Sequence, residues 1–357
     1  MEGLGSKSRR GPVIAVDVMG ADRGPGEVIG GVALALKTGG SDFGKIILVG
    51  RSEVLEAEAR RAGIFSHPKV ERFHAGECVE MHEKAVQSLK QKKDASMFRA
   101  IDLVKIGEAD AVLSCGNTGS LMAGGTLKLR PVDGLYRPAL ATVIPSRFCR
   151  FILVDAGANP ESDVRSLVHN AILGSHYAHN ALQKDRPRVG LLTIGTEEGK
   201  GNEVINQAHA CLRKLGQDRI NYQGLIEGFH VFDNRVDVVV CDGFVGNVVL
   251  KTCESLFKNL KDYLTAELLY NWWRKLGAFM TRGAFRAIGK QLDPDRYGGA
   301  PLLGLNGWVV KAHGSSSRKA VMNALIITTR GLKNQKTPLL IGDLMKANGI
   351  LEGVHSF

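Results

Sequence analysis

Apolar runs of β-forming residues recur five times along this chain, and each is followed by a loop rich in Gly, Asn or Asp. Continuous Val, Ile and Leu runs are typical of parallel strands buried on both faces of a sheet. Each loop leads into a segment with helical spacing, so the alternation predicts an α/β fold. The predicted strands are Val13–Val16, Ala111–Leu113, Phe151–Val154, Val189–Ile194 and Val236–Val240.

Further segments complete this alternation. Lys45–Val49 and Ala139–Val143 are expected to be strands, and the helices are expected at Val28–Leu36, Glu53–Ala62, Phe98–Ile106, Ser166–Leu182 and Asn202–Leu215. We predict a disordered leader over 1–11, because its basic residues are followed by no apolar stretch of the kind a signal peptide needs. A single α/β catalytic domain over 12–347 then forms two lobes around a cleft, and 348–357 is a tail.

The loops after the predicted strands are the candidate binding elements. Open parallel sheets bind ligands outside the carboxyl ends of their strands. Glycine lets the backbone approach a ligand closely, and the free N–H groups of a helix start suit anions. We therefore expect several of these loops to converge on one phosphate-bearing or otherwise anionic substrate.

The loop Gly195–Asn202 has the most unusual composition. Lys200 lies between Gly199 and Gly201, directly before a predicted helix start at Asn202. Lysine and the helix N-terminus together would cradle a phosphate. A solvent-exposed loop with an Asn N-cap is the plainer alternative and stays open. The segment is not a Walker loop, and no predicted strand leads into GxGxxG.

Two later loops and the cysteines supply further candidates. Asp242 stands at a strand end, where a carboxylate would orient a lysine, and His313 adjoins a Gly-Ser-Ser turn. A lone histidine is more often structural than catalytic. Cys115 and Cys241 lie at loop edges, so a covalent cysteine is an alternative, although nothing nearby in the sequence would lower a thiol pKa.

Composition limits the function class. The 357 residues carry a formal net charge of +11, which predicts attraction to an acidic partner. The six cysteines are scattered, without the spacing of a zinc site, which favours small buried thiols in a reducing compartment. No apolar run is long enough to span a membrane.

A basic amphipathic segment over about 256–292 interrupts the α/β pattern. Its apolar residues fall at helical spacing among Arg and Lys, which is the composition of an interfacial helix. A core-facing or dimer-forming helix is equally compatible with the spacing. We expect membrane or dimer contact from Leu269, Trp272, Trp273, Leu276 and Met280.

Taken together, the loops resemble those of the phosphate acyltransferase of bacterial phospholipid synthesis, the PlsX family. The matching blocks are Ile14–Gly20, Gly116–Gly119, Arg137–Ala141, Val154–Asn159, Gly195–Asn202, Asp242–Asn247 and Lys311–Ser316, in order along nearly the whole chain. Two departures are small: Ala21 stands where the family usually has a second glycine, and Cys115 where Ala or Gly is expected. Neither removes an expected catalytic group.

The resemblance implies a fold and a reaction. It implies a three-layer Rossmann-like sandwich with a mostly parallel sheet, similar to isopropylmalate dehydrogenase and phosphotransacetylase. The implied reaction transfers an acyl group from acyl-acyl carrier protein to inorganic phosphate, without a cofactor or metal, and feeds glycerophospholipid synthesis. The implied protein is a cytoplasmic homodimer at the inner face of the membrane, working with the glycerol-3-phosphate acyltransferase of the PlsY family and with no nucleic acid.

The expected mechanism relies on positioning and oxyanion stabilisation. Lys200 would hold phosphate, Asp242 would orient Lys200 or accept a phosphate proton, and His313 would protonate the leaving thiolate. The expected substrate- or phosphate-binding residues are Asp17, Gly20, Gly116, Asn117, Thr118, Gly119, Asp155, Asn159, Gly199, Gly201, Asn202, Gly246 and Asn247.

Three other functions are weighed against this one. A nicotinamide-dependent dehydrogenase of the isopropylmalate type would share the fold, but it needs a metal-binding carboxylate set and a cofactor fingerprint that the sequence does not display. A nucleic-acid-binding protein is suggested by charge alone, without a recognised signature. A scaffold that only docks acyl carrier protein is disfavoured by the many polar loops at strand ends.

Overall fold

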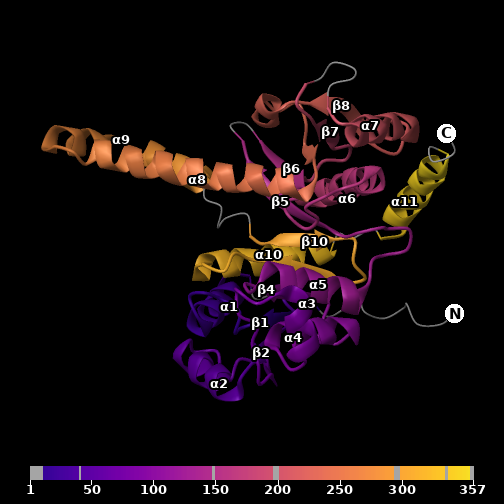
Figure 1. The fold of residues 1–357 in the computed structure, drawn as a ribbon. Helices are drawn as coiled ribbons and strands as arrows, with labels where there is room; N and C mark the ends of the chain where they lie inside the picture. Colours follow the sequence, from indigo (N-terminus) through magenta and orange to yellow (C-terminus); the bar gives the residue numbers. More distant parts are fainter. Residues whose placement is uncertain are drawn as a thin grey trace.

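The computed structural model describes residues 11–39, 42–146, 149–195, 201–292, 298–333 and 337–353. Its strands form one continuous sheet in the order β3-β2-β1-β4-β11-β10-β5-β6-β9-β7-β8. Helices lie on both faces of this sheet (Figure 1), which confirms the predicted three-layer α/β architecture.

Five parallel strands make up the first half of the sheet. They are β3 (Val70–His74), β2 (Lys45–Gly50), β1 (Val13–Asp17), β4 (Ala111–Ser114) and β11 (Trp308–Lys311). Successive side chains of a strand point to opposite faces. Ile14 and Val16 accordingly join one core and Ala15 the other. The first core packs against α1 (Pro25–Gly39), α2 (Ser52–Arg61) and α10 (Arg318–Lys333), and the second against α4 (Ser96–Lys105) and α5 (Thr118–Leu129), with α3 (Ala85–Gln91) beside α5.

Four more parallel strands form the second half. They are β6 (Arg150–Val154), β9 (Val238–Val240), β7 (Arg188–Leu192) and β8 (Asn221–Ile226). One face is covered by α6 (Val164–Leu182), α7 (Glu203–Leu215) and α11 (Thr337–Glu352), which enclose a core with Ile152, Val154 and Leu191. The other face contacts the 3₁₀ helix Gly228–Phe232 and the start of α8 (Gly243–Leu268).

The two halves run in opposite directions. Between β11 and β6 lie β10 (Ala300–Leu303) and β5 (Ala139–Pro145), and each of the three pairings β11–β10, β10–β5 and β5–β6 is antiparallel. Three reversals leave β6 antiparallel to β11. The sheet is therefore mostly parallel, as expected, but it consists of two parallel groups of opposite direction.

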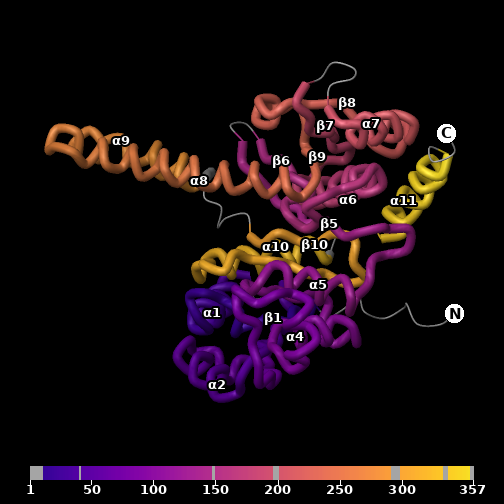
Figure 2. The backbone as a smooth tube through the Cα atoms, viewed as in Figure 1, coloured from indigo at the N-terminus to yellow at the C-terminus, as the bar shows by residue number. Residues whose placement is uncertain are grey.

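Two helices from the end of the chain pack against the body, one in each half. Figure 2 shows α10 beside α1 and α11 beside α6, although these pairs are far apart in the sequence. Val321 and Leu325 of α10 are fully buried in the core beneath α1, and Leu344 and Leu351 of α11 are fully buried in the core around α6.

Two long helices project from the body as a hairpin (Figure 1). Helix α8 has 26 residues, a length of about 39 Å at 1.5 Å per residue, and α9 (Trp272–Leu292) packs against it. The sequence predicts one helical stripe from Leu269 to Met280, but α8 ends at Leu268, so Leu269 belongs to the turn. Among the described residues, no helix combines the length and the apolar composition that crossing a membrane requires.

One expected boundary differs in the structure, that of the C-terminal tail. The tail expected over 348–357 begins later, because α11 continues to Glu352. Asn348 donates to the Gly134 carbonyl at 2.8 Å and contacts His169 at 2.9 Å, so this stretch is part of the packed domain. The leader expected over 1–11 lies, except for Gly11, outside the described residues.

Candidate functional site

A cleft of about 620 Å³ lies between the two halves of the sheet. This volume is within the range of small-molecule sites. Loops that follow β4 and β11 in the first half and β6 and β9 in the second half line it. The contributing polar and glycine positions are Thr118, Thr142, Gly157, Asn247, Lys251, Glu254, Lys258, Gly298, Lys311, His313, Ser315 and Ser316.

On the first side of the cleft, the carboxylate of Asp17 organises the loops. Asp17 is buried at the end of β1 and accepts hydrogen bonds of 2.6 Å from the hydroxyls of Ser96 and Ser114. Burial raises its pKa, whereas these hydroxyl bonds act in the opposite direction. A Cβ on Gly20 would lie 2.7 Å from this carboxylate and 2.8 Å from Gly116 Cα, so glycine is needed for this close approach. Asp17 therefore supports the cleft from beneath.

Asn117 has a similar supporting contact set. Its side-chain oxygen accepts from the Ser120 N–H at 2.9 Å, which caps the N-terminus of α5. Its amide nitrogen donates to the carbonyls of Met81 at 2.7 Å and Glu83 at 3.1 Å. The side chain thus ties a neighbouring loop to the helix start, while the next residue, Thr118, lines the cleft.

On the second side, Asp155 orders the loop after β6. Its carboxylate accepts from the backbone N–H groups of Leu140, Gly157, Ala158 and Asn159 at 2.7–3.2 Å. The Asn159 side-chain amide donates to the same carboxylate at 2.9 Å and to the Pro138 carbonyl. Burial raises the pKa of Asp155, and the N–H donors partly offset this effect.

The start of α8 packs closely on this loop. A Cβ on Gly246 would lie 1.9 Å from the Asp155 carbonyl oxygen, so any larger residue would force the helix away. The Gly243 N–H donates to the Asn159 carbonyl at 2.8 Å. Asp242 caps α8 by accepting from the Val245 N–H at 2.7 Å. This packing holds Asn247 beside Gly157 at the cleft wall.

Lys251, Lys311 and His313 are cationic or potentially cationic side chains that line the cleft, together with Lys258 further along α8. Lys311 is at the end of β11, His313 is in the loop that follows, and Lys251 is in the third turn of α8. Burial lowers the pKa of Lys311; for His313, burial is the first cause and repulsion from Lys251 the second. The Glu254 Oε2 lies 2.8 Å from the Lys251 Nζ, and its negative charge partly offsets the effect of Lys251 on the pKa of His313. A bound anion would relieve this repulsion.

The loop after β7 contributes less to this arrangement. Gly199 and Lys200, the centre of the sequence prediction, lie outside the described residues. Gly201 and Asn202 are described, but neither lines the cleft. Asn202 caps α7 by accepting from the Ile205 N–H at 2.9 Å. This is the Asn N-cap that the alternative of a solvent-exposed loop expects.

The predicted site residues fall into three groups. The cleft is lined by three of them, Thr118, Asn247 and His313. Asp17 and Asp155 do not line it, but their hydrogen bonds hold the loops that do. The loops of Gly116, Gly119, Asn159 and Gly246 belong to this support. The hairpin residues Leu269, Trp272, Trp273, Leu276 and Met280 are at least half exposed and belong to the projection instead.

The sequence interpretation missed Lys251 and gave no role to Lys311. Lys251 follows Asn247 by four residues, so both lie on one face of a helix. That spacing was the available signal. Lys311 is the last residue of β11, and such strand ends commonly carry ligand-binding groups in α/β proteins.

The alternative of a covalent cysteine is wrong for Cys115 and Cys241. Both thiols are buried, and burial raises the pKa of Cys115 to about 12 and that of Cys241 well above its ordinary value. A thiol needs its thiolate form to act as a nucleophile.

Comparison with known proteins gives a consistent result. A family model described as "Fatty acid synthesis protein" matches residues 13–337. The phosphate acyltransferase of Thermoanaerobacter pseudethanolicus is 42% identical over 312 residues, covering 87% of this chain and 91% of that protein. The phosphate acyltransferase of Akkermansia muciniphila is 39% identical over 345 residues, covering 95% and 97% respectively.

Solved structures share the fold at low identity. A phosphotransacetylase from Streptococcus pyogenes superimposes with a TM-score of 0.61 at 17% identity, covering 91% of this chain and 95% of that one. The EutD phosphotransacetylase from Staphylococcus aureus has a TM-score of 0.58 at 15% identity, covering 91% and 94%. These likenesses confirm the predicted similarity to the phosphotransacetylase fold.

Proposed function

The chain belongs to the fatty acid synthesis protein family, together with curated phosphate acyltransferases, and we propose that it transfers an acyl group from acyl-acyl carrier protein to inorganic phosphate. Membership of this family makes the protein an acyltransferase and favours this reaction over the dehydrogenase and scaffold alternatives. The carrier protein and the pathway of glycerophospholipid synthesis belong to the proposal.

One observation carries the proposal: Lys251, Lys311 and His313 line a cleft whose lining also includes apolar side chains of β5, among them Leu140 and Ile144. A phosphate ion between them would exchange mutual repulsion for charge-assisted hydrogen bonds. Thr118, at the N-terminus of α5, adds the positive end of a helix dipole. An acyl group would occupy the apolar side of the same space.

The proposed reaction requires positioning more than proton removal. Phosphate at neutral pH already has oxygens that can attack, and one of them forms a bond to the thioester carbonyl carbon. The carbon–sulfur bond then breaks, and the proton of the attacking hydrogen phosphate passes by way of His313 to the leaving thiolate. Lys311 and helix N–H groups would stabilise the developing oxyanion. The products are acyl phosphate and the free carrier thiol.

Several roles stay predictions. Lys200, with Gly199–Asn202, is proposed as a further phosphate contact. Asp242 is proposed to orient Lys200, in addition to capping α8. Asn247 lines the cleft and is proposed to hold phosphate or the thioester carbonyl.

A basic groove supports the proposed partner. This groove of about 580 Å³ lies between α1, the end of α2 and the start of α10. Lys37, Arg61, His67 and Arg318 line it, and Arg318 follows directly after the cleft loop that contains Ser316. An acidic carrier protein docked there would gain electrostatic steering toward the cleft mouth.

The α8–α9 hairpin supports a peripheral location and self-association. Trp272 and Trp273 are 60% and 66% exposed at its turn, with rings stacked at 3.5 Å. Arg274 and Lys275 follow immediately. Aromatic rings beside basic residues are suited to the lipid headgroup region. We propose that the tip contacts the inner face of the membrane, near the glycerol-3-phosphate acyltransferase of the PlsY family, and that the sides of the hairpin pair in a cytoplasmic homodimer.

The test incubates the purified chain with palmitoyl-acyl carrier protein and inorganic phosphate and detects acyl phosphate by mass spectrometry. We expect Lys311→Met to lower turnover by about 100-fold or more, the typical cost of losing an oxyanion-stabilising group. Lys105→Met, at an exposed position on α4, is the matched control and should retain full turnover. Absence of acyl phosphate with the wild-type protein would refute the proposed reaction, whereas a fully active Lys311→Met would remove only that lysine from the mechanism.

A further inference from the structure

A carboxylate lies among the cationic side chains of the cleft. Glu254 lines the cleft together with Lys251, Lys311 and His313. Within the described part of the chain, Glu254 is the only carboxylate in that lining. A site made of cations alone would bind any oxyanion of suitable size. A fixed negative charge weakens the binding of every anion to which it makes no favourable contact, so its presence here indicates that it contacts the ligand.

The spacing of residues on α8 directs Glu254 toward the same space as the cations. Asn247, Lys251, Glu254 and Lys258 follow one another at intervals of four, three and four residues, which places them on one face of a helix. All four line the cleft. Lys251 and Glu254 act on the pKa of His313 with opposite signs, so this face of α8 lies close to the loop after β11.

Glu254 keeps part of its hydrogen-bonding capacity when it pairs with Lys251. Its Oε2 lies 2.8 Å from the Lys251 Nζ, and its side chain is 34% exposed at the cleft wall. Among the described residues, no donor is paired with its Oε1. An ionised carboxylate offers about four lone-pair positions on its two oxygens and has no proton to donate. Glu254 can therefore accept a further hydrogen bond from a ligand but cannot donate one.

Hydrogen phosphate and sulfate differ in one respect that such a carboxylate can detect. Both are tetrahedral oxyanions of similar size, but hydrogen phosphate retains an O–H group at neutral pH and sulfate does not. The O–H group can donate a charge-assisted hydrogen bond to an ionised carboxylate. Sulfate would place oxygen against oxygen, where the negative charges repel. The hydroxyls of Ser315 and Ser316 and the Asn247 amide both donate and accept, so they suit either anion.

We propose that Glu254 makes the cleft specific for an oxyanion that carries a proton, because its Oε1 accepts a hydrogen bond from the hydroxyl of hydrogen phosphate. The inference rests on the proposed acyl transfer to phosphate and adds the exclusion of sulfate. Lys251 and Lys311 hold the unprotonated oxygens, and the pairing with Glu254 keeps the Lys251 ammonium group beside them. No covalent bond forms or breaks in this recognition step. A hydrogen bond to a charged group changes affinity by a factor of roughly 10–100.

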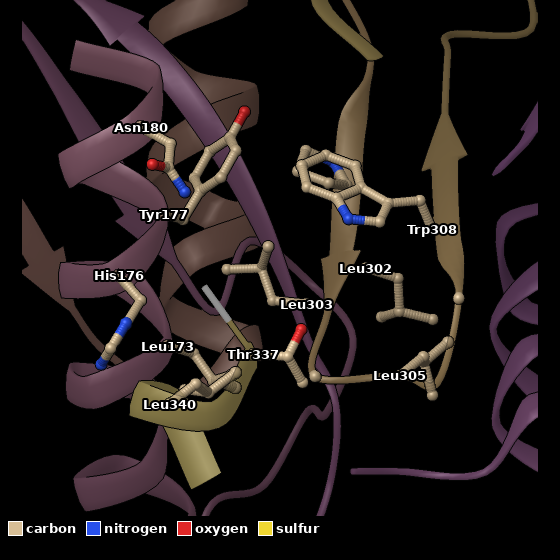
Figure 3. A pocket seen from close by; sticks show the side chains of 13 residues that line it. Leu173, His176, Tyr177, Asn180, Leu302, Leu303, Leu305, Trp308, Thr337 and Leu340 are labelled. Carbon is tan, nitrogen blue, oxygen red and sulfur yellow. The ribbon is translucent and has the colours of Figure 1, made fainter. Parts of the chain in front are cut away.

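A second cavity is not an alternative site for the anion. It encloses about 70 Å³ between α6, β10 and the start of α11, and its walls include Tyr177, Leu303 and Trp308 (Figure 3). Among the described residues that line it there is no lysine or arginine. Its His176 Nε2 already contacts the Asp343 carboxylate at 2.8 Å. An oxyanion placed there would lose its hydration without gaining a cationic partner.

Isothermal titration calorimetry of the full chain with phosphate, sulfate and monofluorophosphate, slightly above neutral pH, tests this specificity. Monofluorophosphate has the charge and shape of hydrogen phosphate, but fluorine replaces the hydroxyl. We expect the wild-type protein to bind phosphate at least about tenfold more tightly than either other anion. Glu254→Gln should reduce both ratios to within about threefold, because the glutamine amide can donate to an unprotonated oxygen. Glu267→Gln, at an exposed position of the same helix outside the cleft, should retain the wild-type ratios.

The ratios separate recognition of the proton from an effect of charge. If Glu254→Gln raised the affinity for all three anions by the same factor, Glu254 would act by charge alone and the proposal would be overturned. A wild-type protein that binds sulfate as tightly as phosphate, or binds none of the anions, would overturn it as well. If circular dichroism shows that Glu254→Gln is unfolded, Glu254→Ala replaces it and the same ratios decide. Calorimetry needs no turnover, so failure of the proposed acyl transfer is recognised separately, by the absence of acyl phosphate.

Discussion

Replacing Asp155 by alanine tests whether this carboxylate supports the cleft or contacts substrate. Its side chain accepts from four backbone N–H groups and from the Asn159 amide, and it does not line the cleft. Asp155→Ala would leave these donors without their acceptor. We therefore expect a loss of folding stability, followed by a loss of activity as the Gly157 loop moves.

The magnitude follows from the burial of each donor. The Leu140 N–H is buried, and leaving it unsatisfied costs about 1–3 kcal/mol, whereas each of the three partly buried N–H groups loses about 0.5–1.5 kcal/mol. Burial raises the pKa of Asp155, which shows that burying its charged carboxylate is unfavourable. The substitution removes this unfavourable contribution and so offsets part of the lost stability. We expect the free energy of unfolding to fall by about 3–4 kcal/mol.

Guanidinium unfolding, followed by circular dichroism, measures this change. The matched control is Asp163→Ala on the same segment, where the carboxylate accepts only the Ser166 N–H at the start of α6. Losing such a cap costs about 1 kcal/mol. If Asp155→Ala proved no more destabilising than Asp163→Ala while phosphate KM rose steeply, Asp155 would be a substrate contact, and the supporting role would be refuted.

Three further predictions address the cleft, the hairpin and the basic groove. Burial and Lys251 lower the pKa of His313, so an added phosphate dianion should raise that pKa. NMR titration of the imidazole measures it, and His313→Asn assigns the signal. A pKa that phosphate leaves unaltered would place the anion elsewhere. Trp272→Ser combined with Trp273→Ser should weaken sedimentation with anionic vesicles severalfold and leave acyl transfer in solution intact; unchanged sedimentation would assign the hairpin to dimer packing alone. Arg61→Glu should raise KM for the carrier-protein thioester about tenfold and leave KM for a pantetheine thioester unaltered, as measured by steady-state kinetics at low salt. An equal rise for both thioesters would argue against carrier docking in the groove.

The elements of the fold were largely predictable because local patterns specify them. The apolar run at Val13–Val16 became β1, and Ser166–Leu182 lies inside α6. Asn202, considered as a helix cap, does cap α7, whereas α8 is capped by Asp242, a residue expected to orient a lysine. A carboxylate and an amide compete for such positions on equal terms, so the sequence leaves the choice open.

Pairing and direction needed the tertiary structure. Alternating strands and helices predict parallel pairing within each half, but no local pattern encodes the three antiparallel pairings of β10 and β5 that reverse the second half. Only the folded chain brings the loops after β4, β6, β9 and β11 to one cleft. It also brings Lys251 and Lys311, which are 60 positions apart in the sequence, into the lining of that cleft.

The sequence by itself determined the element types, the glycine-rich loops and the family, because propensity, turn chemistry and ordered motifs are local properties. Only the tertiary structure decided which polar residues face the cleft and which lie beneath it. Asp17 and Asp155 look like binding residues in the sequence, yet hydroxyl and backbone donors surround both carboxylates. A buried charge must be satisfied by whatever groups the fold brings near it, and that environment exists only once the chain is folded.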